Sequence, residues 1–126
     1  MSGHDQVPDG PAVDVREAWE SASNKESYIL DVREPEELEE ISVPGALHVP
    51  LDSLAAQASA LPTDRELLVI CRSGVRSAFA TKFLRDSGFS GTRNISGGVI
   101  AWAEAELPYY SDGQAYNQPE DDSRPD

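Results

Sequence analysis

The most constraining feature of the sequence is the run Leu67-Leu68-Val69-Ile70, which is apolar at every position instead of at alternate ones. A strand with one face in water alternates apolar and polar residues, whereas a strand buried on both faces does not. Strands buried on both faces occur mainly in parallel sheets that carry helices on each side. The run therefore predicts a central strand of an α/β protein.

The segments around this run alternate between strand-like and helix-like patterns. Strands are predicted at 28–32, 46–49, 67–70 and 92–95, and helices at 14–23, 34–40, 53–59, 78–87 and 99–103. Asp52 is the expected N-cap of the helix 53–59, and helical spacing predicts that Phe79, Phe83 and Leu84 share one apolar face of the helix 78–87. Together these elements predict a three-layer sandwich in which helices flank a central, mostly parallel sheet of about five strands.

One folded domain accounts for the length of 126 residues. Residues 1–12 and 111–126 are poor in aliphatic side chains and rich in Asp, Pro, Gly and Ser. Such segments bury too little apolar surface to offset the entropy of ordering them. We therefore expect a disordered N-terminal tail over 1–12, a folded domain over 13–110, and a disordered acidic tail over 111–126.

Charge and composition exclude several classes of function. The chain carries 23 acidic and 10 basic residues, a net charge of -13, which argues against binding to nucleic acid. A single cysteine and two histidines cannot form an internal disulfide or a zinc site of four Cys/His ligands. The sequence shows neither a long apolar run nor a leader-like N-terminus. We expect a cytoplasmic monomer that binds neither nucleic acid nor membrane.

Cys71 directly follows the strand 67–70, at the sheet edge where open α/β proteins bind their ligands. In the turn 71–77, backbone N–H groups can form an anion-binding nest in front of the next helix. Arg72 and Arg76 are expected to lower the thiol pKa and to form a locally positive mouth, and Gly74 allows a positive φ. A lone buried cysteine is usually a packing residue, but packing does not require flanking cations. The pattern favours a nucleophile.

The segment Cys71-Arg72-Ser73-Gly74-Val75-Arg76-Ser77 resembles the active-site loop of the single-domain rhodanese-like sulfurtransferases. Asp31–Glu34 with Val43–Ala46 resembles their upstream motif, and Gly97–Trp102 resembles their closing motif. The resemblance covers about residues 13–109 in the expected order. Many members carry a His where this chain has Ser42, a difference expected to alter local turn contacts more than sulfur transfer.

The resemblance implies a reaction and a set of site residues. Cys71 is the implied nucleophile: it takes a sulfane sulfur from thiosulfate or a persulfide donor and holds it as a cysteine persulfide. A thiol, small or on a protein, or cyanide then accepts the sulfur. The implied substrate-binding residues are Arg72, Ser73, Gly74, Val75, Arg76 and Ser77. No metal, nucleotide or prosthetic group is implied, because the chemistry is a covalent exchange at sulfur.

Two alternative functions are open. Phosphatases and arsenate reductases of the same fold space their Cys and Arg one residue wider, a position occupied here by Ser77. Non-catalytic interaction modules of this fold typically lack the cysteine that this chain retains. Both alternatives are therefore weaker than sulfur transfer.

Other candidate residues have structural interpretations. Asp31 and Arg33 are best explained as a structural ion pair, and His48 as a core or edge residue. The acidic run 34–40 is predicted to be a solvated helix face.

Overall fold

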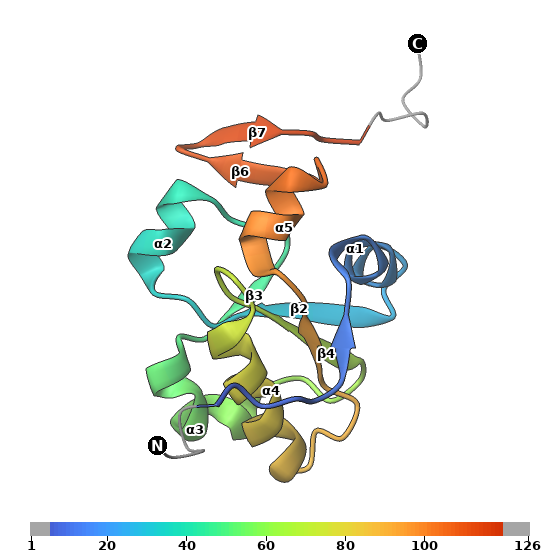
Figure 1. Ribbon diagram of the computed structural model, residues 1–126, viewed down its shortest axis with the longest axis vertical. Helices are drawn as coiled ribbons and strands as arrows, with labels where there is room; N and C mark the ends of the chain where they lie inside the picture. Colours follow the sequence, from blue (N-terminus) through green and yellow to red (C-terminus); the bar gives the residue numbers. More distant parts are fainter. Residues whose placement is uncertain (1–5, 120–126) are drawn as a thin grey trace.

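A sheet of five parallel strands forms the centre of the molecule, in the order β1-β5-β4-β2-β3 (Figure 1). The computed structural model describes residues 6–119. The strands are β1 (Ala12–Val13), β2 (Ser27–Asp31), β3 (Leu47–His48), β4 (Glu66–Ile70) and β5 (Arg93–Ile95). The predicted fold class is confirmed.

Helices cover both faces of this sheet (Figure 1). They are α1 (Val15–Ser23), α2 (Pro35–Glu40), α3 (Leu54–Gln57), α4 (Val75–Asp86) and α5 (Gly98–Glu104). Side chains of α1 and α5 pack with Leu68 and Ile70 in one core cluster, and those of α3 and α4 pack with Leu67 and Val69 in the other. The residues 67–70 of β4 thus point alternately to opposite faces and are all buried, as the unbroken apolar run predicts.

The helix α4 differs from its prediction. It begins at Val75, and its buried residues are mostly small; they are Ser77, Ala78, Ala80, Thr81 and Leu84. Phe79 and Phe83 are 39% and 38% exposed, so only Leu84 of the predicted apolar face is buried. Small side chains let the helix backbone approach the sheet closely, and this turns the two phenylalanines outward.

The segment predicted as one helix over 53–59 is broken into three short pieces. A 3₁₀ turn, η2 (Leu51–Ser53), precedes α3, and a second, η3 (Ala58–Ala60), follows it. Ser53 N–H donates to the Pro50 carbonyl at 2.8 Å, which closes the first 3₁₀ turn. Asp52 therefore lies inside this turn and is not the N-cap of α3.

The predicted tails contain ordered strands. Ala12 belongs to β1 and pairs with Asn94 of β5. Beyond residue 108, β6 (Tyr109–Ser111) and β7 (Gln114–Tyr116) form an antiparallel hairpin through Asp112 and Gly113, both at positive φ. The parts of the predicted tails at 1–5 and 120–126 lie outside the described residues.

The hairpin joins the main body next to α2. Ser42 and Tyr110 exchange two backbone hydrogen bonds of 2.9 Å, and the Asp112 N–H donates to the Glu39 carbonyl at 3.1 Å. Ser42, where many family members carry His, thus supports the hairpin through its backbone. Among the described residues, no helix is long and apolar enough to cross a membrane.

Candidate active site

Cys71 lies at the carboxyl end of β4, inside the loop that leads to α4. Its side chain is buried, with 1% of the residue exposed. The sulfur accepts hydrogen bonds from the backbone N–H groups of Gly74 at 3.2 Å and Ser77 at 3.3 Å. Gly74 adopts φ +103°, a conformation that favours glycine. The loop is therefore an anion-binding ring around one sulfur atom.

Opposing effects act on the pKa of the Cys71 thiol, and their net result is a lowered pKa. Burial raises it, because a thiolate loses solvation in the interior. Hydrogen bonding lowers it, by the Ser77 hydroxyl when its proton points to the sulfur, and by the backbone N–H groups of Ser77, Gly74 and Ser73. The predicted direction is correct, but hydrogen bonds of the loop, and not the two arginines, are the principal cause.

The loop rests on the start of α5. The N–H groups of Val99 and Ile100 donate to the carbonyls of Cys71 at 2.9 Å and Arg72 at 3.2 Å. A Cβ atom at Gly98 would collide with the same two carbonyl groups. The glycine pair of the closing motif thus allows α5 to pack directly against the Cys71 loop.

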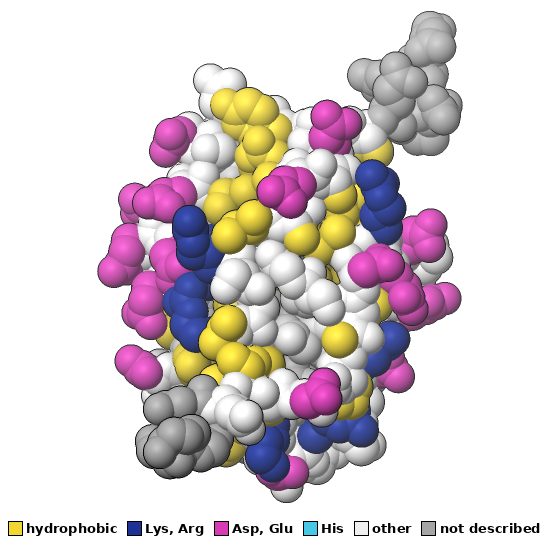
Figure 2. All heavy atoms as spheres, viewed as in Figure 1, with side chains coloured by type: hydrophobic (Ala, Val, Ile, Leu, Met, Phe, Trp, Pro, Cys, Tyr) yellow, Lys and Arg dark blue, Asp and Glu magenta, His cyan; other side chains and the backbone are white. Residues whose placement is uncertain are grey.

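The two arginines of the loop have different surroundings. Arg76 of α4 forms two hydrogen bonds of 2.8 Å to the carboxylate of Glu37 on α2. Arg72 is exposed, and within residues 6–119 its side chain has no hydrogen bond or ion pair. The predicted positive mouth is therefore only partly formed, because a carboxylate already compensates one of its two cations. In Figure 2, acidic side chains gather along the edge of the molecule near α2, with basic ones beside them.

The sequence pattern predicts a solvated helix face for Glu37, but its carboxylate contacts Arg76 of the Cys71 loop. Arg76 and the Glu34 backbone N–H hydrogen-bond its carboxylate. The Arg76 contact is the largest cause that brings the pKa of Glu37 from 4.5 to about 2. The same pairing raises the pKa of Arg76. Both groups therefore carry full charge at neutral pH.

The predicted ion pair of Asp31 and Arg33 is present and buried, with 1% and 2% of the side chains exposed. Arg33 also donates to the carbonyls of Glu37 and Ile41 at the end of α2. The pair thereby fixes α2 against the sheet. His48 Nε2 lies 2.7 Å from the Arg33 carbonyl oxygen, in agreement with a structural role.

No pattern in the sequence selects Asn94 of β5, yet its side chain contacts the loop twice. Its Oδ1 accepts from the Ser77 hydroxyl at 2.6 Å, and its Nδ2 donates to the Gly74 carbonyl at 3.1 Å. The Ser77 oxygen also lies 3.2 Å from the Cys71 sulfur. Asn94 thus hydrogen-bonds Ser77 and Gly74, two residues that themselves contact the sulfur.

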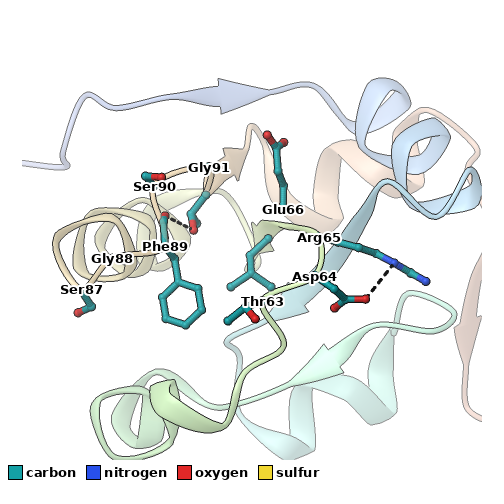
Figure 3. Close-up of a pocket in the computed structure, with 11 residues that line it drawn as sticks. Thr63, Asp64, Arg65, Glu66, Ser87, Gly88, Phe89, Ser90 and Gly91 are labelled. Carbon is teal, nitrogen blue, oxygen red and sulfur yellow. Dashed lines mark hydrogen bonds and ion pairs between the residues drawn. The ribbon is translucent and has the colours of Figure 1, made fainter.

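A cavity of about 630 Å³ lies elsewhere, between residues 63–67 and 87–92 (Figure 3). Glu66, the first residue of β4, lines it, so the cavity is at the opposite end of that strand from Cys71. Within residues 6–119, no three His, Cys, Asp or Glu side chains are close enough together to hold a metal ion.

The structure combines a parallel α/β sheet with a cysteine that is surrounded by N–H donors at the carboxyl edge of the sheet. This combination is typical of proteins in which a thiolate reacts with small anions or with sulfur groups. The family model described as the rhodanese-like domain matches residues 8–105. The chain belongs to the rhodanese-like sulfurtransferase family.

Similar proteins agree with this membership. A putative sulfurtransferase of Bacillus subtilis, YtwF, is 40% identical over 86 residues, which are 68% of this chain and 82% of the relative. A sulfurtransferase of Allochromatium vinosum is 36% identical over 87 residues, 69% and 81% of the two chains. The crystal structure of a rhodanese-related protein from Thermoplasma volcanium superposes with a TM-score of 0.74 at 31% identity, covering 80% of this chain and 98% of that one. These relatives support a transferase of sulfur-containing groups.

Proposed function

We propose that this protein carries a sulfane sulfur as a persulfide on Cys71, taking it from thiosulfate or a persulfide and passing it to a thiol or to cyanide. The observation that supports this most directly is the ring of N–H donors around the Cys71 sulfur, with Gly74 at 3.2 Å and Ser77 at 3.3 Å. Donors placed in this way stabilise a thiolate without a neighbouring base.

In the loading step the Cys71 thiolate attacks the outer sulfur of thiosulfate. A new sulfur–sulfur bond forms, the bond between the outer sulfur and the sulfonate breaks, and sulfite leaves with the bonding electron pair. The outer sulfur then carries the negative charge of the persulfide. The N–H groups of the loop are suited to hold this charge.

In the unloading step a nucleophilic acceptor attacks the outer sulfur of the persulfide. With cyanide the product is thiocyanate, and with a thiolate it is a new persulfide. In both cases the bond to the Cys71 sulfur breaks, and that sulfur leaves as the thiolate with which the cycle began. Two half-reactions with one covalent intermediate give ping-pong kinetics.

The burial of Cys71 limits the shape of both substrates. With 1% of the residue exposed, its sulfur is reached only by a slender terminal sulfur. Arg72 is exposed and has no carboxylate partner among residues 6–119, so it is the cation best placed to attract the oxygens of an anionic donor. Thiosulfate has this shape and charge, as does a persulfide on a flexible segment of a protein.

The test is the intact mass of the protein after incubation with thiosulfate and removal of the excess. We expect the parent to gain one sulfur atom, and cyanide to remove it with formation of thiocyanate. The variant Cys71→Ser should gain nothing, because the chain has no other cysteine.

A persulfide donor, such as glutathione persulfide, is tested in parallel. Loading by the persulfide alone would restrict the donor class and leave the carrier role of Cys71 intact. If neither donor loads the folded parent with its thiol reduced, or if Cys71→Ser loads equally well, the proposal is wrong.

A further inference from the structure

We propose that Asn94 is a positioning residue for sulfur transfer. Its side-chain oxygen accepts the one hydrogen bond that the Ser77 hydroxyl can donate, so the Cys71 thiolate does not receive that hydrogen bond. This inference deepens the proposed function and rests on it for its meaning. The contact geometry itself does not depend on which donor or acceptor the protein uses.

The orientation of the Asn94 amide is fixed by its two contacts. Nδ2 donates to the Gly74 carbonyl at 3.1 Å, which places Oδ1 at 2.6 Å from the Ser77 oxygen. Reversing the amide would bring Oδ1 against the Gly74 carbonyl, where two acceptors repel each other. Asn94 therefore presents only an acceptor to Ser77.

The hydroxyl of Ser77 has one proton and two neighbouring acceptors. It lies 2.6 Å from Asn94 Oδ1 and 3.2 Å from the Cys71 sulfur, and a hydroxyl donates only once. The shorter contact to an amide oxygen is the stronger hydrogen bond. Ser77 therefore turns a lone pair toward the sulfur. A lone pair can accept the proton of the Cys71 thiol, but it repels the negative charge of the Cys71 thiolate.

Ionisation and loading of Cys71 have different effects on this arrangement. When the thiol ionises, the sulfur can take the Ser77 proton only if Asn94 Oδ1 loses it. When the sulfur is loaded, the charge moves to the outer sulfur, and the inner sulfur no longer needs that proton. Asn94 thus destabilises the free thiolate relative to the persulfide. A less stable Cys71 thiolate is a stronger nucleophile in the loading step and a poorer leaving group in the unloading step.

Other charged groups around the loop are the same in every comparison proposed below. They are Arg72 of the loop, Arg76 of α4, Glu37 of α2, the Asp31–Arg33 pair at the end of β2, and His48 of β3. Differences among variants of Asn94 and Ser77 therefore report on the hydrogen bonds at the sulfur.

The test compares two substitutions that both remove the donor to Gly74. Asn94→Leu also removes the acceptor, whereas Asn94→Asp retains an acceptor and adds negative charge. The rate of Cys71 alkylation by iodoacetamide is measured against pH. For Asn94→Leu, the midpoint of the profile should move to lower pH, because the thiolate gains one hydrogen bond from Ser77. The alkylation rate below the midpoint should rise about threefold, since the larger thiolate fraction is partly offset by the weaker nucleophilicity of that thiolate. For Asn94→Asp, the midpoint should move to higher pH.

The effect of Asn94→Leu should vanish when Ser77→Ala is present, because the hydroxyl that carries it is gone. Midpoints that move the same way in both Asn94 variants would show that only the lost Gly74 contact matters, and would overturn the inference. So would an effect of Asn94→Leu that survives in the Ser77→Ala background. Melting curves select variants that are folded, and the backbone hydrogen bonds of β5 do not depend on the Asn94 side chain.

Transfer measurements connect the inference to the reaction. A protein preloaded with one sulfur should release it to cyanide about threefold faster with Asn94→Leu, and more slowly with Asn94→Asp, because a more stable thiolate leaves faster. Alkylation does not require sulfur loading. If the alkylation profiles of the Asn94 variants differ but the protein loads no sulfur, the proposed function alone is refuted. If the protein loads sulfur but the profiles are identical, the role of Asn94 alone is refuted.

Discussion

Two arginine–carboxylate pairs stand near the Cys71 loop, and they differ chiefly in burial. Asp31–Arg33 has 1% and 2% of its side chains exposed, whereas Glu37–Arg76 has 25% and 35% exposed. Both pairs have contacts of 2.8 Å, so their local geometry is equally good. Burial separates the two pairs: the inner one is committed to the fold, and the outer one is partly open to solvent and contributes less to stability.

The inner pair supports the outer one. Arg33 donates to the carbonyls of Glu37 and Ile41, and so it holds the end of the helix that carries the Glu37 carboxylate. The outer pair then sets how much of the Arg76 charge is available at the site. The two arginines thus differ in role: Arg33 supports the fold, and Arg76 places a partly compensated positive charge beside the Cys71 loop.

The largest effect is expected from Asp31→Asn, which leaves the Arg33 cation buried without its carboxylate. Breaking a buried pair in this way costs about 3–5 kcal/mol of the free energy of unfolding. Urea denaturation measures this change. The matched control, Glu37→Gln, removes the carboxylate of the exposed pair and should cost less than about 1 kcal/mol. Equal losses in the two variants would abolish the distinction between the pairs.

The next effect is that of Arg76→Ala on the use of thiosulfate. It removes a cation that can bind the donor and leaves the Glu37 carboxylate to repel it. A hydrogen bond to a charged group is worth about 1.5–3 kcal/mol, so kcat/KM should fall about tenfold or more. Lys82→Ala, which removes an exposed cation from the same helix, is the control and should change kcat/KM little. Similar losses in both variants would indicate a general field effect.

A smaller effect of opposite sign is expected from Glu37→Gln, which releases Arg76 from its partner. The KM for thiosulfate should fall about threefold, in line with the modest energies of partly exposed pairs. Glu36→Gln removes the same charge from an exposed neighbouring position on α2 and should have less effect. A higher KM in Glu37→Gln would mean that the carboxylate is needed to aim the guanidinium.

The smallest effect is the pH dependence of the outer pair. The pKa of Glu37 is lowered from 4.5 to about 2 in the folded protein, first by its hydrogen bond with Arg76. The stabilisation is therefore complete above the unfolded value and is lost as pH falls through about 2. We expect the stability of the parent relative to Glu37→Gln to decline by less than about 1 kcal/mol over this range. Urea midpoints at several pH values measure the decline, and a constant difference would contradict it.

The sheet could be predicted from sequence because its information is local. An unbroken apolar run such as 67–70 specifies burial on both faces, and helix signals between strands specify a parallel connection. The outward turn of Phe79 was not predictable in the same way. Helical spacing of apolar residues predicts the face with the largest side chains as the buried one. In α4, a face of small residues such as Ala80 packs against the sheet instead.

The hairpin at 109–116 was missed because tail composition was given more weight than turn chemistry. Asp112-Gly113 between two short tyrosine-containing segments is a strong hairpin signal. The loop around Cys71 could be located because its residues are contiguous. Glu37 and Asn94 could not be assigned to it, since they come from distant segments and one sequence contains no distances.

The pairing of β1 with β5 has a consequence for how the chain assembles. Ala12 and Val13 lie near the start of the chain, yet their partners in the neighbouring strand are Asn94 and Ile95. During synthesis on a ribosome, the first strand is finished long before its neighbour exists. The edge of the sheet formed by β1 therefore closes only after β5 has emerged, so this domain is completed only once residues 93–95 have been synthesised.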